Sequence, residues 1–205
     1  MADYWDFSDV DITPYIHNES GIQELMEGIN PQRKKTKERE YCTRTVIALS
    51  ERHPESLFAR WDEFVKCFDT DNASSKMASL YVIANLAIGD KTDRFEQTLP
   101  AYIKLLNDPS VGVCSHAAMN LGKIAKANAG LREKITGYLL AIQEINKNPE
   151  RVDMISGYTI KAFDVYFDES EQKDSIVGFV FGLLESKSPS TQKVARAFLK
   201  DHGIK

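Results

Sequence analysis

A proline that follows a helix-capping residue recurs along this chain of 205 residues. These dipeptides are Asn30-Pro31, Asp108-Pro109, Asn148-Pro149 and Ser188-Pro189. An N-cap side chain accepts a backbone N–H, and proline at the first helical position gives up only an N–H without a partner in the helix. The prolines are 78, 40 and 40 positions apart, and the acidic turn Asp69-Thr70-Asp71 falls midway through the longest interval. Five helix starts at a period of 39 to 40 residues predict stacked helical repeats.

Apolar residues recur at helical spacing between these starts, and no segment alternates with a period of two. We therefore expect five helix pairs, at 22–29 and 32–53, 56–68 and 74–88, 93–107 and 110–127, 131–145 and 150–167, and 171–185 and 190–202. Capping boxes at Ser20-x-x-Gln23 and Asp93-x-x-Glu96 are expected to open the first and third pairs. One pair cannot bury its apolar face, whereas stacked pairs bury a continuous core. The predicted fold is all-α, an α–α superhelix of about five helix pairs, with residues 21–205 forming a single domain.

The third pair carries the sequence most typical of a known family. Residues 99–113 read LPAYIKLLNDPSVGV, and residues 117–125 read AAMNLGKIA. The proline inside the first helix (Pro100), the turn residue Asp108, the valine five residues later and the Ala-Ala-x-x-Leu-Gly run resemble the HEAT-repeat family. HEAT proteins are mainly scaffolds that bind other macromolecules along a concave surface lined by the second helices. The resemblance implies the same fold and role for this chain.

The third pair also departs from the HEAT pattern at one position. HEAT repeats often place an arginine directly after the turn valine, where it joins a ladder with the turn aspartate. This chain has Cys114 at that position, and the fifth repeat has Ser188 at the turn and Val194 at the arginine position. We therefore expect the ladder to be absent or rudimentary, and stacking to depend on apolar burial.

The first 20 residues differ in composition from the rest of the chain. They contain five acidic residues, no lysine or arginine, and four aromatic residues: Tyr4, Trp5, Phe7 and Tyr15. We expect an acidic, aromatic arm over residues 1–20 that packs its rings on the otherwise uncovered edge of the first repeat. The alternative is a flexible arm that binds a partner.

Composition excludes several classes of protein. A net charge of −4 and a pI of about 5.6 argue against a general nucleic-acid binder. No apolar run approaches the roughly 20 residues that span a bilayer, and the first residues do not resemble a signal peptide. Cys42, Cys67 and Cys114 are widely spaced, so they predict neither a zinc site nor a disulfide framework. We expect a cytoplasmic protein without membrane contact.

No arrangement of residues predicts catalysis, a metal site or a cofactor. Of the four histidines, only His116 lies in the middle of a predicted helix, and Cys114, two positions away, points in another direction. The chain has no His-Glu dipeptide, no two histidines four apart and no glycine-rich phosphate loop. We therefore expect no catalytic residue, no metal and no cofactor.

A basic run crowds the start of the second predicted helix. It consists of Arg33, Lys34, Lys35, Lys37 and Arg39. Such a run can contact phosphates, which would suit nucleic-acid binding or DNA-alkylation repair by a HEAT-like protein. Alternatively it is a solvated helix end, or it pairs with the chain's own acidic arm. A second alternative function, a HEAT-like lyase or small-molecule binder, depends on the resemblance alone.

Alignment of the second helices on their apolar residues gives a column of candidate binding residues. The column contains Arg44, Tyr81, Met119 and Tyr158, and one turn further on come Asn85 and Lys123. Tyrosine and methionine offer adaptable contact area, and arginine often anchors interfaces. The sequence therefore favours a non-enzymatic scaffold that binds a protein or peptide, of unknown identity, on the concave face. The alternative is that these side chains only pack between repeats.

Overall fold

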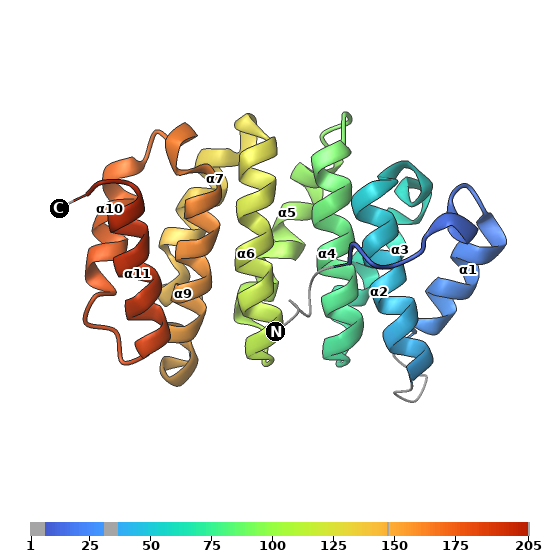
Figure 1. The fold of residues 1–205 in the computed structure, drawn as a ribbon, viewed down its shortest axis with the longest axis horizontal. Coiled ribbons are helices and arrows are strands. Elements are labelled where there is room, and N and C mark those ends of the chain that lie inside the picture. Colours follow the sequence, from blue (N-terminus) through green and yellow to red (C-terminus); the bar gives the residue numbers. More distant parts are fainter. Residues whose placement is uncertain (1–6, 31–36, 147, 205) are drawn as a thin grey trace. The chain divides into compact units, whose positions relative to one another are not determined.

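The computed structural model describes residues 7–30, 37–146 and 148–204, and within these ranges every regular element is helical (Figure 1). The predicted all-α class is therefore confirmed. The chain divides into two compact units, unit 1 (Met1–Thr98) and unit 2 (Leu99–Lys205). A single domain over residues 21–205 stays a prediction.

Unit 1 contains two helix pairs. Its α-helices are α1 (Glu19–Gly28), α2 (Lys37–Arg52), α3 (Trp61–Lys66), α4 (Ala73–Gly89) and the start of α5 (Arg94–Lys104). Helix α2 packs against α1 and α4, and α3 packs against α4. The fold thus places the two second helices, α2 and α4, side by side.

The single helix expected over 56–68 is wrong, because that segment is broken. It consists of the 3-10 turns η2 (Pro54–Ser56) and η3 (Phe58–Arg60), the short α3, and η4 (Cys67–Asp69). The residues whose spacing predicted the helix are nevertheless buried, Trp61 and Phe64 among them. Apolar spacing indicates which residues face the core, but it does not distinguish backbone bonds over three residues from bonds over four.

Unit 2 is built of two layers of helices. Its elements after α5 are η5 (Leu105–Asn107), α6 (Val111–Ala127), α7 (Ala129–Leu140), α8 (Ile142–Ile145), α9 (Pro149–Tyr166), η6 (Phe167–Glu169), α10 (Lys173–Gly182) and α11 (Pro189–Asp201). Helix α9 packs between α6 and α11, whereas α7 packs against α6 and α10 (Figure 1). The second helices of the repeats therefore form one layer, and the first helices form the other.

Helices α6 and α9 approach each other closely at one glycine. A Cβ atom added to Gly122 would lie 2.6 Å from the carbonyl oxygen of Ala162 and 2.7 Å from its Cα. Around this contact Leu121, Ile124 and Phe163 are fully buried. The small residues of the HEAT-like segment thus permit backbone-to-backbone packing at the centre of unit 2.

Two of the predicted proline helix starts are confirmed. Helix α9 begins at Pro149, and α11 begins at Pro189 with Ser188 as its N-cap. The Ser188 hydroxyl accepts a hydrogen bond from the Thr191 amide at 3.3 Å. Pro31 lies outside the described residues.

The other two predicted starts are wrong by one or more positions. Ser110 caps α6 and accepts from the Val113 amide at 3.5 Å, while the Asp108 carboxylate accepts from the Ser110 amide at 2.8 Å. Asn72 caps α4 and accepts from the Ser75 amide at 3.0 Å. In both turns the acidic residue precedes the true cap, a position at which aspartate favours a turn.

The capping box predicted at Ser20-x-x-Gln23 does not open α1. Asn18 caps α1 through the Gly21 amide at 3.2 Å. Before α5, Asp90 accepts from the amides of Thr92 and Phe95, at 2.8 and 3.0 Å. Burial of Asp90 raises its pKa, but these hydrogen bonds outweigh it and hold the pKa below its usual value. Asp93 has a φ of 54°, the left-handed conformation.

Replacing Asn72 with alanine is expected to lower the free energy of unfolding by about 1 kcal/mol, because the Ser75 amide loses its acceptor. The matched control is Asp71→Ala. Asp71 is the exposed residue before Asn72 and belongs to the turn from which the cap was predicted, and its replacement is expected to cost less than about 0.5 kcal/mol of the free energy of unfolding. Urea denaturation of both variants checks the assignment. A larger loss for Asp71→Ala would show that the acidic residue is the cap.

Polar side chains join successive repeats in unit 2, in addition to the apolar burial on which stacking was expected to depend. The side-chain Nδ2 of Asn146 donates to the Leu106 carbonyl at 3.0 Å, and the Thr191 hydroxyl donates to the Asp153 carbonyl at 2.7 Å. The Arg151 guanidinium donates to the Pro109 carbonyl. These bonds satisfy carbonyls of the neighbouring repeat's turns and helix.

Cys114, at the position where HEAT repeats often have arginine, also serves a turn. Its thiol is buried and donates to the Asp108 carbonyl at 3.0 Å. Burial raises the pKa of this thiol to about 11. The residue is therefore a neutral donor inside the fold.

Candidate functional site

The N-terminal arm, defined here as residues 7–18, lies on the second helices of unit 1. It runs from α1 across α2 and reaches α4 (Figure 1). Its first described residues form a turn, in which the Val10 amide donates to the Phe7 carbonyl at 3.2 Å. The arm therefore covers the surface on which Arg44, Tyr81 and Asn85 are predicted to bind a partner.

Phe7 anchors the arm. Its side chain is only 5% exposed, and its ring meets the Tyr81 ring edge to face with centroids 6.3 Å apart. The guanidinium carbon of Arg44 lies 5.3 Å from the Phe7 centroid, within the range of a cation–π contact. Tyr81 is itself only 3% exposed. Of the two alternatives that the sequence left open for it, the exposed binding residue is wrong and packing inside the fold holds. Tyr81 lies beneath Phe7, which covers it.

Two arginines of α2 hold the polar atoms of the arm. Arg44 Nη2 lies 2.9 Å from Asp9 Oδ1, and Arg52 Nη2 donates to the Val10 carbonyl at 2.5 Å. Asp11 lies close enough to Arg52 for an electrostatic contribution, although hydrogen bonds from Thr13 are the main cause that lowers the pKa of Asp11. The acidic arm thus meets cations of α2.

The remainder of the arm continues along the first repeat. Ile12 is buried, and the hydroxyl oxygens of Tyr15 and Tyr41 lie 3.2 Å apart. This hydrogen bond, with burial, raises the pKa of Tyr15 to about 12. The predicted packing of the arm's rings is confirmed for Phe7, but Phe7 reaches α4 of the second repeat and not the edge of the first. Tyr4 and Trp5 lie outside the described residues.

Asn85 connects two helices of unit 1 and does not face solvent. Its side chain is buried, and Nδ2 donates to the Ser50 hydroxyl oxygen at 2.9 Å. Ser50 in turn donates to the Ile47 carbonyl at 2.7 Å. The expectation that Asn85 is exposed is therefore wrong, because this pair links α4 to α2.

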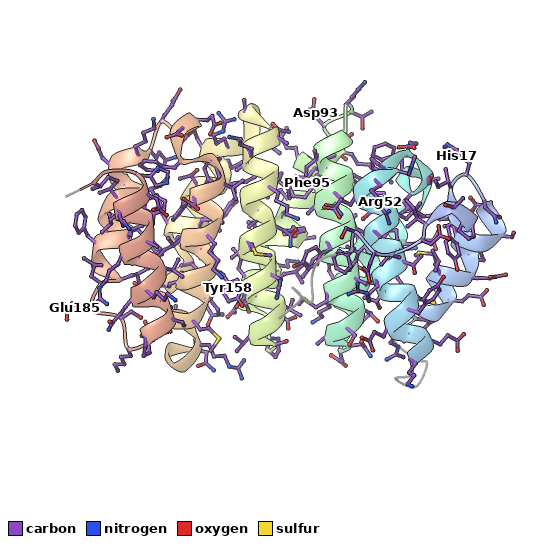
Figure 2. All side chains as sticks on the ribbon, viewed as in Figure 1. His17, Arg52, Asp93, Phe95, Tyr158 and Glu185 are labelled. Carbon is purple, nitrogen blue, oxygen red and sulfur yellow. The ribbon has the colours of Figure 1, made fainter. Side chains whose placement is uncertain are left out.

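In unit 2 the corresponding candidates reach the surface. Met119 and Lys123 on α6, and Tyr158 on α9, are each partly exposed. Figure 2 labels the side chain of Tyr158. The Tyr158 ring lies 5.6 Å from the His116 ring, and Lys161 Nζ lies 4.8 Å from the Tyr158 centroid. Tyr158 thus packs against His116 and Lys161 and remains partly exposed.

Helix α9 also presents a surface that the sequence column missed. Met154 and Val165 are 48% and 40% exposed, and with Tyr158 and Lys161 they follow helical spacing along one face. We call these four residues the α9 stripe. Their spacing could be read from the sequence, but the second helices were aligned on their buried apolar residues, so the exposed residues of α9 were not compared.

The predicted basic run does not form a surface patch in the residues that can be described. Arg33, Lys34 and Lys35 lie outside them, and Lys37 is exposed. Arg39 is 6% exposed, and its guanidinium donates to the Asn30 carbonyl at 3.1 Å. The assignment of Arg39 to a solvent-facing patch is therefore wrong, because it holds α2 to the end of α1.

Neither a metal centre nor a membrane span is found in the described part of the chain. Within residues 7–30, 37–146 and 148–204, no three side chains of His, Cys, Asp or Glu are grouped so that they could hold a metal ion. In the same ranges no helix combines the length and apolar character required to cross a bilayer.

The comparisons with known proteins identify the fold class. No family model matches the chain, and no curated protein sequence is significantly similar to it. Among solved structures, the designed armadillo repeat protein YIII(Dq)4CqI is similar, with a TM-score of 0.52 and 16% sequence identity over 96% of this chain and 90% of that one. The chain is therefore an all-α helical-repeat protein of the solenoid class, as the HEAT resemblance implied.

Proposed function

We propose that this protein is a non-enzymatic scaffold that binds a segment of another protein on the second helices of its repeats. The main support is that α2 and α4 already hold a piece of polypeptide. The arm has no strand and only one short helical turn, and it is bound through an aromatic anchor, a carboxylate and a carbonyl. A surface of this kind thus has the chemistry to bind irregular polypeptide.

The equivalent surface of unit 2 supplies similar chemistry in a partly exposed form. Tyr158 and Met119 offer adaptable apolar area, and Lys123 and Lys161 offer cations for carboxylates or carbonyls. Met154 and Val165 extend this area along α9. Partly exposed aromatic and apolar side chains beside cations are typical of binding surfaces.

The side chains that could support catalysis are used structurally, which favours a binding role. The Cys114 thiol has a pKa raised to about 11 by burial, and a neutral thiol is a poor nucleophile. His116 is buried and packs against Tyr158. Nucleic-acid binding gains no support, since Arg39 is buried and the net charge is −4.

The proposal predicts that peptides selected from a random display library on the intact protein depend on Tyr158. For the selected peptides, Tyr158→Ala is expected to weaken the affinity at least about tenfold, because truncating an aromatic anchor removes most of its contact area. Fluorescence polarisation with labelled peptides measures this change.

The matched control is Tyr138→Ala on α7, in the layer of first helices, where Tyr138 is also partly exposed. This variant is expected to bind the peptides with unchanged affinity. Melting temperatures confirm that both variants are folded. Selected peptides whose affinity is the same for Tyr158→Ala, Met119→Ala and the parent protein would contradict the proposed surface.

A further inference from the structure

We infer that the α2–α4 surface recognises a turn with an aromatic residue followed two positions later by a carboxylate, and that Phe7-Ser8-Asp9 of the chain's own arm is its internal ligand. The partner is then a second protein that presents the same pattern, and it competes with the arm for this surface. The inference rests on the proposed function, because it takes the second helices to be binding surfaces.

Arg44 makes the recognition specific for the pair of side chains. Its guanidinium lies over the Phe7 ring, with the carbon 5.3 Å from the centroid, and the same group places Nη2 2.9 Å from Asp9 Oδ1. A planar guanidinium can stack on a ring and donate to a carboxylate at the same time, which an ammonium group does less well. One side chain of α2 therefore contacts both parts of the aromatic–x–Asp pattern.

The turn places the two side chains on this arginine. The Val10 amide donates to the Phe7 carbonyl, which closes the chain around Ser8 and Asp9. Ser8, between Phe7 and Asp9, is exposed. Arg52 binds the Val10 carbonyl, a main-chain group that every sequence offers. The surface therefore reads the first and third residues and positions the fourth through its backbone.

The arm is attached in a way that permits exchange. Of residues 7–18, only Phe7 and Ile12 are buried. The contacts described above for Phe7, Asp9 and the Val10 carbonyl are made by side chains of α2 and α4, so breaking them leaves the helical backbone hydrogen bonds intact. Departure of Phe7 would uncover Tyr81. The surface and its ligand thus behave as a receptor and a tethered peptide.

Tethering sets how strongly the arm competes. A ligand on a short flexible linker has an effective concentration in the millimolar range. An external turn with the same contacts therefore binds the intact chain more weakly than it binds a chain whose internal ligand has been disabled. This difference is measurable without knowledge of the natural partner.

The test uses the full chain carrying Phe7→Ala and Asp9→Asn, which disables the internal ligand and leaves α2 and α4 unchanged. The probe is an acetylated peptide with the sequence of residues 7–12, FSDVDI. The matched control peptide has alanine and asparagine in place of its phenylalanine and first aspartate. NMR signals of the Arg44 side chain and the Tyr81 ring report binding, even at millimolar dissociation constants.

The probe is expected to shift both signals in the double variant, with an apparent dissociation constant at least about tenfold lower than in the parent chain. The control peptide is expected to cause no shift. Asp9→Asn alone, at an exposed carboxylate, keeps the test valid if the double variant does not fold; it should also bind the probe more tightly than the parent chain does.

Three results would overturn the inference: no shift of either signal in the folded variants at saturating probe, equal affinity for parent and variants, or a parent chain that is dimeric through exchange of arms. If the FSDVDI probe does not bind but the selected peptides still bind in a way that depends on Tyr158, the proposed function stands and the further inference fails. Probe binding without any Tyr158-dependent binding would contradict the binding surface proposed for unit 2 and not the recognition of the turn.

Discussion

Replacing Gly122 with alanine is expected to lower the free energy of unfolding by about 2–3 kcal/mol, because the new methyl group has no space. Its Cβ would lie 2.6 Å from the Ala162 carbonyl oxygen and 2.7 Å from the Ala162 Cα. Both are backbone atoms of α9, so a side-chain rotation cannot relieve the overlap. Helices α6 and α9 must separate, and the buried contacts of Leu121 and Phe163 weaken.

The same substitution at Gly178 is the matched control. Gly178 lies inside α10, and a Cβ there would meet nothing within 4 Å. Alanine is a better helix former than glycine, so Gly178→Ala is expected to stabilise the protein by about 0.5–1 kcal/mol. Urea denaturation of the two variants measures both effects. Similar effects with the same sign would show that α6 and α9 are not packed backbone to backbone.

Tyr81 and Tyr158 occupy matching positions in their repeats, yet we expect alanine to have very different effects at the two. Tyr81→Ala removes a ring that is 3% exposed beneath Phe7, and is expected to cost about 3 kcal/mol of stability. Tyr158→Ala removes a partly exposed ring and is expected to cost about 1 kcal/mol or less. Thermal or urea denaturation measures the two losses.

A double-mutant cycle assigns part of the Tyr81 effect to the arm. Phe7→Ala and Tyr81→Ala are expected to be coupled by about 0.5–1.5 kcal/mol, the range for an edge-to-face aromatic pair. Additive losses, or a loss at Tyr81 as small as that at Tyr158, would mean that the arm does not cover α4.

The helices could be predicted from the sequence more reliably than their first residues. Apolar spacing marks the buried side of a helix over several turns, so α4, α6, α9 and α11 were located closely. The caps were harder to predict, because Asp108-Pro109-Ser110 and Asp71-Asn72 each contain two good N-cap residues within three positions. Only the hydrogen bond of Ser110 or Asn72 decides between them.

The sequence predicted which residues occupy matching positions in successive repeats, but it did not predict which of them are exposed. Tyr81 and Tyr158 align along the chain, but a segment more than 70 positions earlier covers only Tyr81. No local pattern contains such a contact. Pairing of the acidic arm with the basic run was one alternative that the sequence left open, and most of that run lies outside the described residues. The structure pairs Asp9 with Arg44, in the middle of α2.

The central claim is that the second helices of the repeats bind polypeptide, and a chemical-shift map tests it most directly. The intact protein is titrated with a peptide selected on it, and backbone amide shifts are followed along the chain. The account predicts that the largest changes lie on α6 and α9, around Met119, Lys123 and Tyr158. Changes confined to α7 and α10, the layer of first helices in unit 2, would contradict it.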